Sequence, residues 1–266
     1  MEAMILAAGA GTRLKPLTDR LPKALVEVNG RAMVARVLDR LIEAGASRVI
    51  VNTHHHEEQV RAFVQEYRPN EIEIVLSPEP DGPYETGGGL FAAAPLFKEG
   101  SPLLLHNVDV ISSVPLKEMV ATHHAEMGRS EPAPIASLAV LTRDADRRLL
   151  FDDLGLLGWE NTGSDRADLG SHRVREPVGE LLSMAFTGLH VVDPKIFSLS
   201  DRTGVFSIIT LYLELAAAGH RILPIDVSAH EWIDIGTQEK LEEAERAERR
   251  KGGRADGRTG GQADRR

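Results

Sequence analysis

MILAAGAGTRLKPLTDRLPKALVEVNG, residues 4–30, is the stretch that decides the fold of this chain. It opens with an apolar run over 4–8, which is too short for an independent helix and long enough for a buried parallel strand. The glycines that follow, Gly9 and Gly11, leave the backbone open, so that several N–H groups of the turn can point at phosphate oxygens. The stretch therefore predicts a strand that leads into a polyphosphate-binding loop. Basic side chains follow in this loop at Arg13, Lys15 and Lys23.

The composition is that of an ordinary globular protein with one large domain or two small ones. The 266 residues are 42% hydrophobic and 27% charged, which provides enough apolar material for a sizeable core. The net charge of −9 argues against a nucleic-acid partner, since that binding depends on clustered basic residues. With no cysteine, disulfides and thiolate metal sites are excluded. Because a secretory leader and long apolar runs are absent, we expect a cytoplasmic protein without a membrane partner. A monomer or a homodimer is expected.

Helix and strand patterns alternate after the loop. Apolar residues at helical spacing predict helices over 32–43 and 57–67, and apolar runs predict strands over 48–52 and 71–76. This order predicts an α/β fold: a Rossmann-like, mostly parallel mixed sheet with helices on both faces. Ligands of such sheets bind beyond the carboxyl ends of the strands. The loops that follow the strands are therefore the first places to look for a site.

The same patterns continue to residue 250. The polar stretch 161–176 predicts a loop beside the cleft. The last residues are rich in glycine and arginine, so we expect one domain over 1–250 and a disordered tail over 251–266. Further helices are expected over 90–97, 115–125, 206–218 and 238–249, strands over 101–110, 135–141, 181–192 and 221–227, and a β-hairpin over 149–159.

A glycine-rich helix start lies at Glu85-Thr86-Gly87-Gly88-Gly89. The N-terminus of a helix offers free amides and partial positive charge, and glycines let a flat base or a phosphate approach closely. A glycine turn without a ligand is the alternative, since such turns are common. In combination with the first loop, the segment favours a nucleotide-binding role.

A carboxylate follows the strand predicted over 101–110. The strand ends in Asn107-Val108-Asp109, which puts Asp109 at the edge of the sheet where ligands bind. Magnesium binds through one or two carboxylates together with substrate phosphates, and Asp109 suits that role. A purely structural aspartate in a turn is the alternative.

The order of residues over 4–30 resembles the signature of the nucleoside-diphosphate-sugar pyrophosphorylases, which transfer a nucleotidyl group from a nucleoside triphosphate to a sugar 1-phosphate. A Walker A loop fits less well, because no Gly-Lys-Ser/Thr closes the loop, and a dinucleotide fingerprint lacks its third glycine. The resemblance implies a glycosyltransferase-A-like nucleotidyltransferase fold. The matching residues are Leu6, Ala7, Ala8, Gly9, Gly11, Thr12, Arg13, Pro16, Leu17, Thr18, Pro22, Lys23, Ala24, Leu25 and Gly30.

The resemblance also implies roles for individual residues. Arg13 and Lys23 are expected to be catalytic, with Arg13 facing the leaving pyrophosphate and Lys23 facing the α-phosphate and the acceptor phosphate. Asp109 and Asp234 are expected to hold Mg²⁺; Asp234 stands in an Asp-x-Gly-Thr motif, for which helix capping is the alternative explanation. The expected nucleotide-binding residues, with Gly9 to Gly11 cradling the triphosphate, are Leu6, Ala7, Ala8, Gly9, Ala10, Gly11, Thr12, Glu85, Thr86, Gly87, Gly88 and Asn107.

The strand predicted over 181–192 contains a glycine, Gly188. A glycine inside a strand often marks a close approach of a ligand to the backbone. Because the segment resembles the acceptor-binding strand of the family, Thr187, Gly188 and His190 are candidates to contact the sugar. Local packing is an equally good explanation of the three residues.

Within the family, the compact length and the Glu-Thr-Gly-Gly-Gly segment are most similar to short N-acetylmuramate 1-phosphate uridylyltransferases. Guanylyltransferases for mannose or heptose 1-phosphate and cytidylyltransferases for phosphocholine share the first loop and stay open. Val108 departs from the glycine or serine that the family more usually has. A non-catalytic nucleotide-sugar sensor is disfavoured because Lys23, Asp109 and Asp234 are all present, and a dinucleotide oxidoreductase is disfavoured by the missing glycine.

Overall fold

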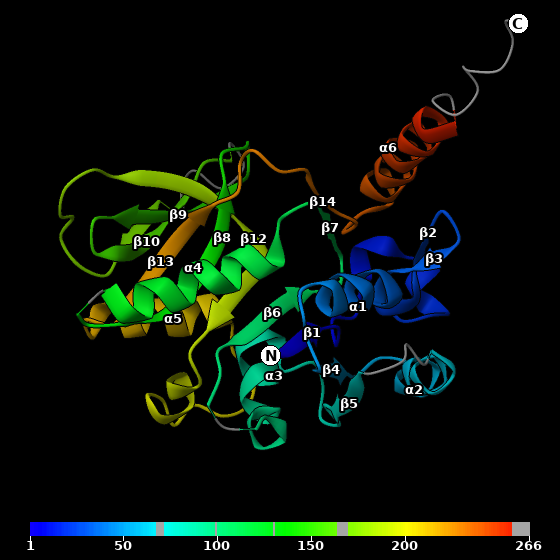
Figure 1. Ribbon diagram of the computed structural model, residues 1–266, viewed down its shortest axis with the longest axis horizontal. Helices are drawn as coiled ribbons and strands as arrows, with labels where there is room; N and C mark the ends of the chain where they lie inside the picture. Colours follow the sequence, from blue (N-terminus) through cyan, green and yellow to red (C-terminus); the bar gives the residue numbers. More distant parts are fainter. Residues whose placement is uncertain (68–71, 99, 130, 164–169, 257–266) are drawn as a thin grey trace, which may run out of the picture.

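The computed structural model describes residues 1–67, 72–98, 100–129, 131–163 and 170–256. Its centre is one sheet of ten strands flanked by helices (Figure 1). Among these residues no helix combines the length and the apolarity that a membrane crossing requires. In spatial order the strands are β11 (Ser171–Arg173), β10 (Gly155–Asn161), β9 (Arg147–Asp152), β12 (Leu182–Val192), β6 (Leu103–Asn107), β1 (Glu2–Leu6), β4 (Arg48–Thr53) and β5 (Glu73–Pro78), while β8 (Pro134–Leu141) and β13 (Arg221–Asp226) join through β12.

The N-terminal half of the sheet is parallel. Strand β1 pairs with β6 on one edge and with β4 on the other, and β5 follows β4. Side chains of β1 alternate between two cores: Ile5 packs in one core with Leu38 of α1 (Met33–Glu43), and Met4 packs in the other with Leu90 of α3 (Glu85–Ala92). Helix α2 (Glu57–Glu66) connects β4 to β5. Both faces of this half are covered, which confirms the Rossmann-like prediction.

The C-terminal half is organised around β12. This long strand is antiparallel to β6 along one edge and to β8 along the other, and its first residues pair antiparallel with β9, so it joins the two halves of the sheet. Its register shifts between Phe186 and His190, where Gly188 has a left-handed φ of 82°. Such irregularities bend a strand and are frequent next to active sites. The predicted hairpin is present as β9 and β10, and the helices of this half are α4 (Leu116–Arg129) and α5 (Ile208–Ala217).

Several elements differ from the sequence prediction. The loop predicted over 161–176 contains strand β11, and residues 164–169 lie outside the described residues. Helix α3 begins at Glu85 rather than at Leu90, so the three glycines lie inside it. The strand predicted over 101–110 is divided: β6 ends at Asn107, and β7 (Val110–Ser112) leaves the main sheet to pair with β14 (Trp232–Asp234). The last helix, α6 (Gln238–Asp256), continues beyond the predicted end at residue 249. The first part of the predicted tail is therefore helical, and residues 257–266 lie outside the described residues.

Candidate active site

The ribbon formed by β7 and β14 brings Asp109 and Asp234 together. Asp109 directly precedes β7, and Asp234 is the last residue of β14. The strands are antiparallel with Val110 opposite Asp234, and the Ile235 amide donates a hydrogen bond of 2.9 Å to the Asp109 carbonyl. Two carboxylates from distant parts of the sequence therefore share one end of the ribbon.

The N-terminal loop brings cations to the same place. The loop folds back through three short 3₁₀ turns, and Lys23 begins the third. Lys23 Nζ lies 2.5 Å from Asp109 Oδ2, with 13% and 19% of the two side chains exposed. Arg13 lies against the Asp234 loop, since a Cβ added at Gly236 would come within 2.9 Å of Arg13 Nη2 and 2.7 Å of Asp234 Oδ1. The predicted catalytic residues and the predicted metal ligands are thus in one cluster.

Asp234 is ionised and surrounded by cations. Its Oδ1 accepts a hydrogen bond of 3.1 Å from the Gly236 amide, and its Oδ2 forms an ion pair with Lys240 of α6. Burial alone would raise the pKa of the Asp234 carboxyl, but the Lys240 ammonium, the Gly236 amide and the charge of Arg143 lower that pKa below its ordinary value. The sequence analysis missed Lys240 because it stands in a highly charged helix, where a lysine is unremarked. It missed Arg143 because nothing in the local pattern marks it.

A cavity of about 180 Å³ opens beside Lys23 and Asp109. It lies at the carboxyl ends of β1, β4 and β6, where a parallel sheet binds its ligands. Gly9 leaves room there, because nothing lies within 4 Å of the place where its Cβ would stand. Six of the twelve predicted nucleotide-binding residues therefore meet at one cavity. The lining residues are Leu6, Ala8, Gly9, Lys23, Asn52, Pro83, Glu85, Thr86, Asn107, Val108 and Asp109.

A buried polar network braces this cavity. Asn52 Oδ1 accepts hydrogen bonds from the amides of Ala7 at 2.5 Å and Ala8 at 3.3 Å, and Asn52 Nδ2 donates to Glu79 Oε1 at 2.7 Å. Glu79 is also buried, and its Oε2 accepts from the Tyr84 amide at 2.6 Å. Burial raises the pKa of Glu79, although both hydrogen bonds oppose that shift. The network connects the start of the N-terminal loop, at Ala7 and Ala8, to the segment before α3 through hydrogen bonds.

The sequence analysis missed both Asn52 and Glu79. Asn52 is still inside β4, and Glu79 directly follows β5 between two prolines, where the local pattern indicates only a rigid loop. The available signal was an amide side chain at the carboxyl end of an otherwise apolar parallel strand. The Ala7 amide is bonded to Asn52 in this network, and contact of Ala7 with a nucleotide stays a prediction.

Gly87 and Gly88 have a packing role. Their amides donate hydrogen bonds of 3.0 and 3.1 Å to the Phe206 carbonyl, so these groups at the helix start are already used. A Cβ at Gly87 would lie 2.5 Å from the Phe206 ring. The two amides are therefore engaged with Phe206, and contact of Gly87 and Gly88 with the nucleotide stays a prediction. Glu85 and Thr86 of the same segment do line the cavity.

The next residues of the N-terminal loop, Ala10 to Thr12, are not among the residues that line the cavity. Gly11 has a left-handed φ of 61°, and a Cβ there would be 2.9 Å from the Thr18 side chain. The Thr18 hydroxyl in turn donates a 2.8 Å hydrogen bond to the Gly11 carbonyl. This glycine is therefore needed to fold the loop back, and nucleotide contact by Ala10, Gly11 and Thr12 stays a prediction.

The acceptor candidates on β12 separate into one residue at the site and two in the core. Gly188 is at the site, since a Cβ there would lie 2.5 Å from Asn107 Nδ2. The buried Thr187 hydroxyl donates to the Ala139 carbonyl at 2.8 Å. His190 is 1% exposed with Nδ1 2.6 Å from the Tyr212 hydroxyl, and burial lowers its pKa to about 3. Both side chains pack in the interior, and contact of Thr187 and His190 with the sugar stays a prediction that this packing does not support.

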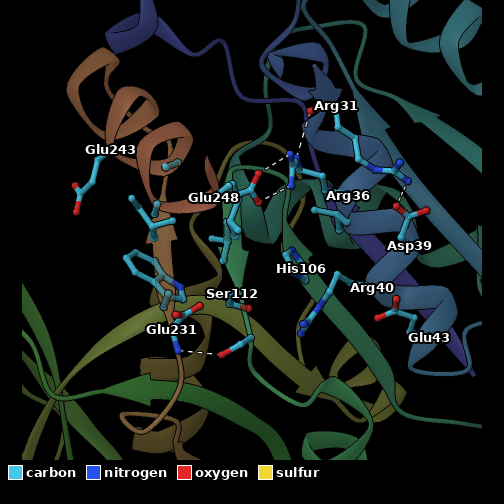
Figure 2. Close-up of a pocket in the computed structure, with 18 residues that line it drawn as sticks. Arg31, Arg36, Asp39, Arg40, Glu43, His106, Ser112, Glu231, Glu243 and Glu248 are labelled. Atoms are coloured by element: carbon cyan, nitrogen blue, oxygen red, sulfur yellow. Dashed lines mark hydrogen bonds and ion pairs between the residues drawn. The ribbon is translucent and has the colours of Figure 1, made fainter. Parts of the chain in front are cut away.

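A larger cavity, of about 590 Å³, lies between α1, the β7–β14 ribbon and α6 (Figure 2). Figure 2 shows Arg36 facing Glu248 across it, with nitrogen to oxygen distances of 2.6 and 2.8 Å. Arg31 is paired with Asp39, and Arg40 donates to the Val114 carbonyl. Its arginines are thus already engaged, and neither aspartate of the ribbon lines it. Size alone therefore does not mark the site.

The donor set at the ribbon fits a magnesium ion. Within the described ranges, no group of three or more His, Cys, Asp or Glu side chains is arranged to hold a metal without other ligands. Asp109 and Asp234 supply carboxylate oxygens, which magnesium prefers, and this ion usually takes its remaining ligands from water and substrate phosphates. The pair therefore suits a metal that binds with a phosphorylated substrate.

Comparison with known proteins gives consistent results. Residues 2–143 match the family described as Nucleotidyl transferase. The N-acetylmuramate alpha-1-phosphate uridylyltransferase of Caulobacter vibrioides is 32% identical over 219 residues, which cover 82% of this chain and 85% of that protein. The enzyme of the same name from Neisseria meningitidis serogroup B is 28% identical over 247 residues, covering 92% and 97%. A UDP-glucose pyrophosphorylase solved with UDP-glucose has the same fold, with a TM-score of 0.72 at 15% identity over 94% of this chain and 98% of that one.

Proposed function

The chain belongs to the nucleotidyl transferase family, and we propose that it transfers the uridylyl group of UTP to N-acetylmuramate 1-phosphate and releases pyrophosphate. Transfer of a nucleotidyl group to a sugar 1-phosphate is the activity of the family. The choice of uracil and N-acetylmuramate is supported by the two uridylyltransferases that match this chain over most of its length.

The ion pair between Lys23 and Asp109 is the observation that carries the assignment of the site. It lies at the cavity formed by the ends of three strands, and its 2.5 Å distance keeps a cation and a carboxylate poised where phosphates would bind. We assign Lys23 to the α-phosphate and the acceptor phosphate, and Arg13 to the leaving pyrophosphate. The open backbone at Gly9 supports a role for this loop in cradling the triphosphate.

The reaction needs no covalent enzyme intermediate. An oxygen of the sugar phosphate forms a bond to the α-phosphorus, and the bond from that phosphorus to the bridging oxygen of the β-phosphate breaks, so that pyrophosphate leaves. A phosphate monoester loses its second proton at a pKa of about 6, so the nucleophile is ionised near neutral pH without a general base. Two anions repel each other, so the task of Lys23 and Arg13 is to hold them in line and neutralise their charge.

Asp109 and Asp234 would hold Mg²⁺ at the end of the ribbon. When bound, the ion would neutralise phosphate charge and orient the triphosphate. The residues of the chain would hold the ion through their carboxylates, while Asn52 and Glu79 would fix the backbone of the loop against which the nucleotide rests.

A pyrophosphate-release screen tests the function. The purified protein with Mg²⁺ would be offered UTP, GTP, CTP, ATP and dTTP, each with N-acetylmuramate, mannose, glucose and heptose 1-phosphates and with phosphocholine. We expect the highest kcat/KM for UTP with N-acetylmuramate 1-phosphate. Higher turnover of another pair would replace the proposed substrates. Binding of UDP-sugar without release of pyrophosphate from any pair would favour the sensor hypothesis instead.

A further inference from the structure

The Lys240 side chain forms an ion pair with Asp234, one of the two carboxylates that we propose as metal ligands. Its ammonium is paired with Asp234 Oδ2 and comes from the first turn of α6, directly after the Asp-x-Gly-Thr motif. In that turn the Lys240 amide is 3.4 Å from the Thr237 hydroxyl oxygen. A basic side chain near a helix N-terminus is unfavourable for the helix, because the helix dipole is positive there. Helix stability therefore does not explain why a lysine stands at this position.

Four basic side chains lie around the two aspartates, while Glu85 lines the cavity beside Asp109. Lys23 is paired with Asp109, and Lys240 with Asp234. Two arginines add to them: Arg13 lies against the Asp234 loop, and Arg143 acts on the Asp234 carboxylate from above the Trp232 ring, 4.0 Å from its centroid. A free divalent cation approaching this cluster meets repulsion, whereas a polyanion is attracted.

The two lysines differ in how easily their ammonium groups can move away from the paired carboxylates. The Lys23 and Asp109 side chains are 13% and 19% exposed, so that pair is confined. Lys240 is 38% exposed while Asp234 is 15% exposed, so the ammonium can turn toward solvent or a phosphate and uncover the carboxylate. Lys240 is thus placed to exchange between two anionic partners.

We propose that Lys240 is a positioning residue that covers Asp234 until phosphates arrive, so that the divalent metal reaches Asp234 together with the nucleotide and not before it. This inference rests on the proposed function, since it takes Asp234 as a metal ligand. In the nucleotide-free protein Lys240 competes with the metal for Asp234. When a polyphosphate enters, the ammonium moves to its oxygens and the carboxylate becomes available.

Two binding titrations of the Lys240→Met variant test the proposal without any turnover. In the first, Mn²⁺ is titrated into nucleotide-free protein and the free ion is followed by electron paramagnetic resonance. We expect Mn²⁺ to bind about tenfold more tightly to the variant than to the unchanged protein, because its competitor is gone. In the second, inorganic pyrophosphate is titrated in EDTA by calorimetry, and we expect binding to be roughly fivefold weaker, because one cation is lost.

The opposite signs of the two changes are the diagnostic result. A lysine that merely tethers α6 would lower the melting temperature and leave both affinities alone, which would overturn the proposal. Equal Mn²⁺ affinities, or a gain that survives the additional substitution Asp234→Asn, would overturn it as well. Lys98→Met is the matched control, since it removes another lysine–carboxylate pair, with Glu73 at 3.2 Å, away from the ribbon. Circular dichroism, with Lys240→Gln as a second variant, establishes that the helix is retained.

These titrations are independent of the proposed substrates. Neither uses a nucleoside base or a sugar, so a failure of the uridylyltransferase screen leaves the test of Lys240 intact. Conversely, a protein that releases pyrophosphate as proposed and yet shows no change in either titration would separate the two ideas and remove only this one.

Discussion

The two halves of the sheet use their polar residues differently. In the parallel half, Asn52 and Asn107 stand at the carboxyl ends of strands, and both line the cavity. In the half built on β12, Thr187 and His190 are buried, and their side chains are hydrogen-bonded to Ala139 and Tyr212. Parallel strands all end at the same edge, which collects their polar ends into one site, whereas an antiparallel strand has no such shared edge. Position relative to a strand end therefore indicates function in the first half and not in the second.

The strongest test of the parallel half removes its cation. We expect Lys23→Met to lower kcat by about 10³-fold or more, because the charge that neutralises two phosphates in the transition state is lost. Steady-state pyrophosphate release measures this. Lys15→Met is the matched control in the same loop, since Lys15 forms only an exposed pair with Asp19 at 2.9 Å. Equal losses in the two variants would mean that the loop needs positive charge in general and not this lysine.

The second test compares a buried polar residue from each half. Asn52→Ala leaves the Ala7 amide without its acceptor and Glu79 Oε1 without its donor, so we expect a loss of about 2–4 kcal/mol in the free energy of unfolding together with a raised KM for the triphosphate. Thr187→Val removes a hydroxyl bonded to Ala139, and we expect a loss of about 1–2 kcal/mol with the acceptor KM unchanged. Urea denaturation and initial rates give both quantities. A raised acceptor KM in Thr187→Val would instead indicate that Thr187 contributes to binding of the sugar phosphate.

The third test addresses the place where the halves meet. Gly188→Ala forces a Cβ to within 2.5 Å of Asn107 Nδ2 at a φ of 82°, so we expect a loss of about 2 kcal/mol in unfolding free energy and weaker turnover. Gly219→Ala is the control, with a similar φ of 88° and nothing within 4 Å, and it measures the backbone cost alone. If the two variants are equally stable and active, the contact between residue 188 and Asn107 contributes to neither stability nor turnover.

The fourth test is the dependence of stability on pH, to which each half contributes a buried histidine. Burial lowers the pKa of His106 on β6 to about 4 and that of His190 on β12 to about 3. The unfolded chain binds these protons near pH 6.5 and the folded protein does not, so stability is full above that pH and is lost as the pH falls toward the folded values. Each histidine contributes up to about 1.4 kcal/mol per pH unit. Urea midpoints between pH 6.5 and 5 should fall less steeply in His190→Gln, and an unchanged slope would contradict the assignment of His190 to the neutral core.

The sequence predicted the parallel half well, because the pattern of apolar runs and glycines there is local. The strand before Gly9, the helices around it and the position of Asp109 all follow from residues close in sequence. The approach of Asp234 to Asp109 could be expected only from the family resemblance, since it depends on the pairing of β7 with β14 across the chain. The role of Asn52 depends on partners 45 and 27 residues away, Ala7 and Glu79. Lys240 is only six residues from its partner Asp234, but their contact depends on how the turn before α6 folds, which the local pattern does not show.

The split in the acceptor candidates shows a further limit of sequence patterns. Gly188 was singled out because a glycine inside a strand implies a close approach, and such an approach is present, although the neighbour is Asn107. Thr187 and His190 are polar residues in a strand, as ligand-binding residues often are. The sequence alone does not distinguish a polar side chain that is hydrogen-bonded in the core from one that faces a ligand. Only the burial of each side chain separates the two cases.

The central claim is that the β7–β14 ribbon and the N-terminal loop form one catalytic site. The rate of pyrophosphate release by Asp109→Asn, with UTP and N-acetylmuramate 1-phosphate under saturating Mg²⁺, tests it most directly. We predict a fall of at least about 10³-fold at an unchanged melting temperature, since the substitution removes one carboxylate charge and conserves the shape of the side chain. A variant that releases pyrophosphate at the rate of the unchanged protein would contradict the account.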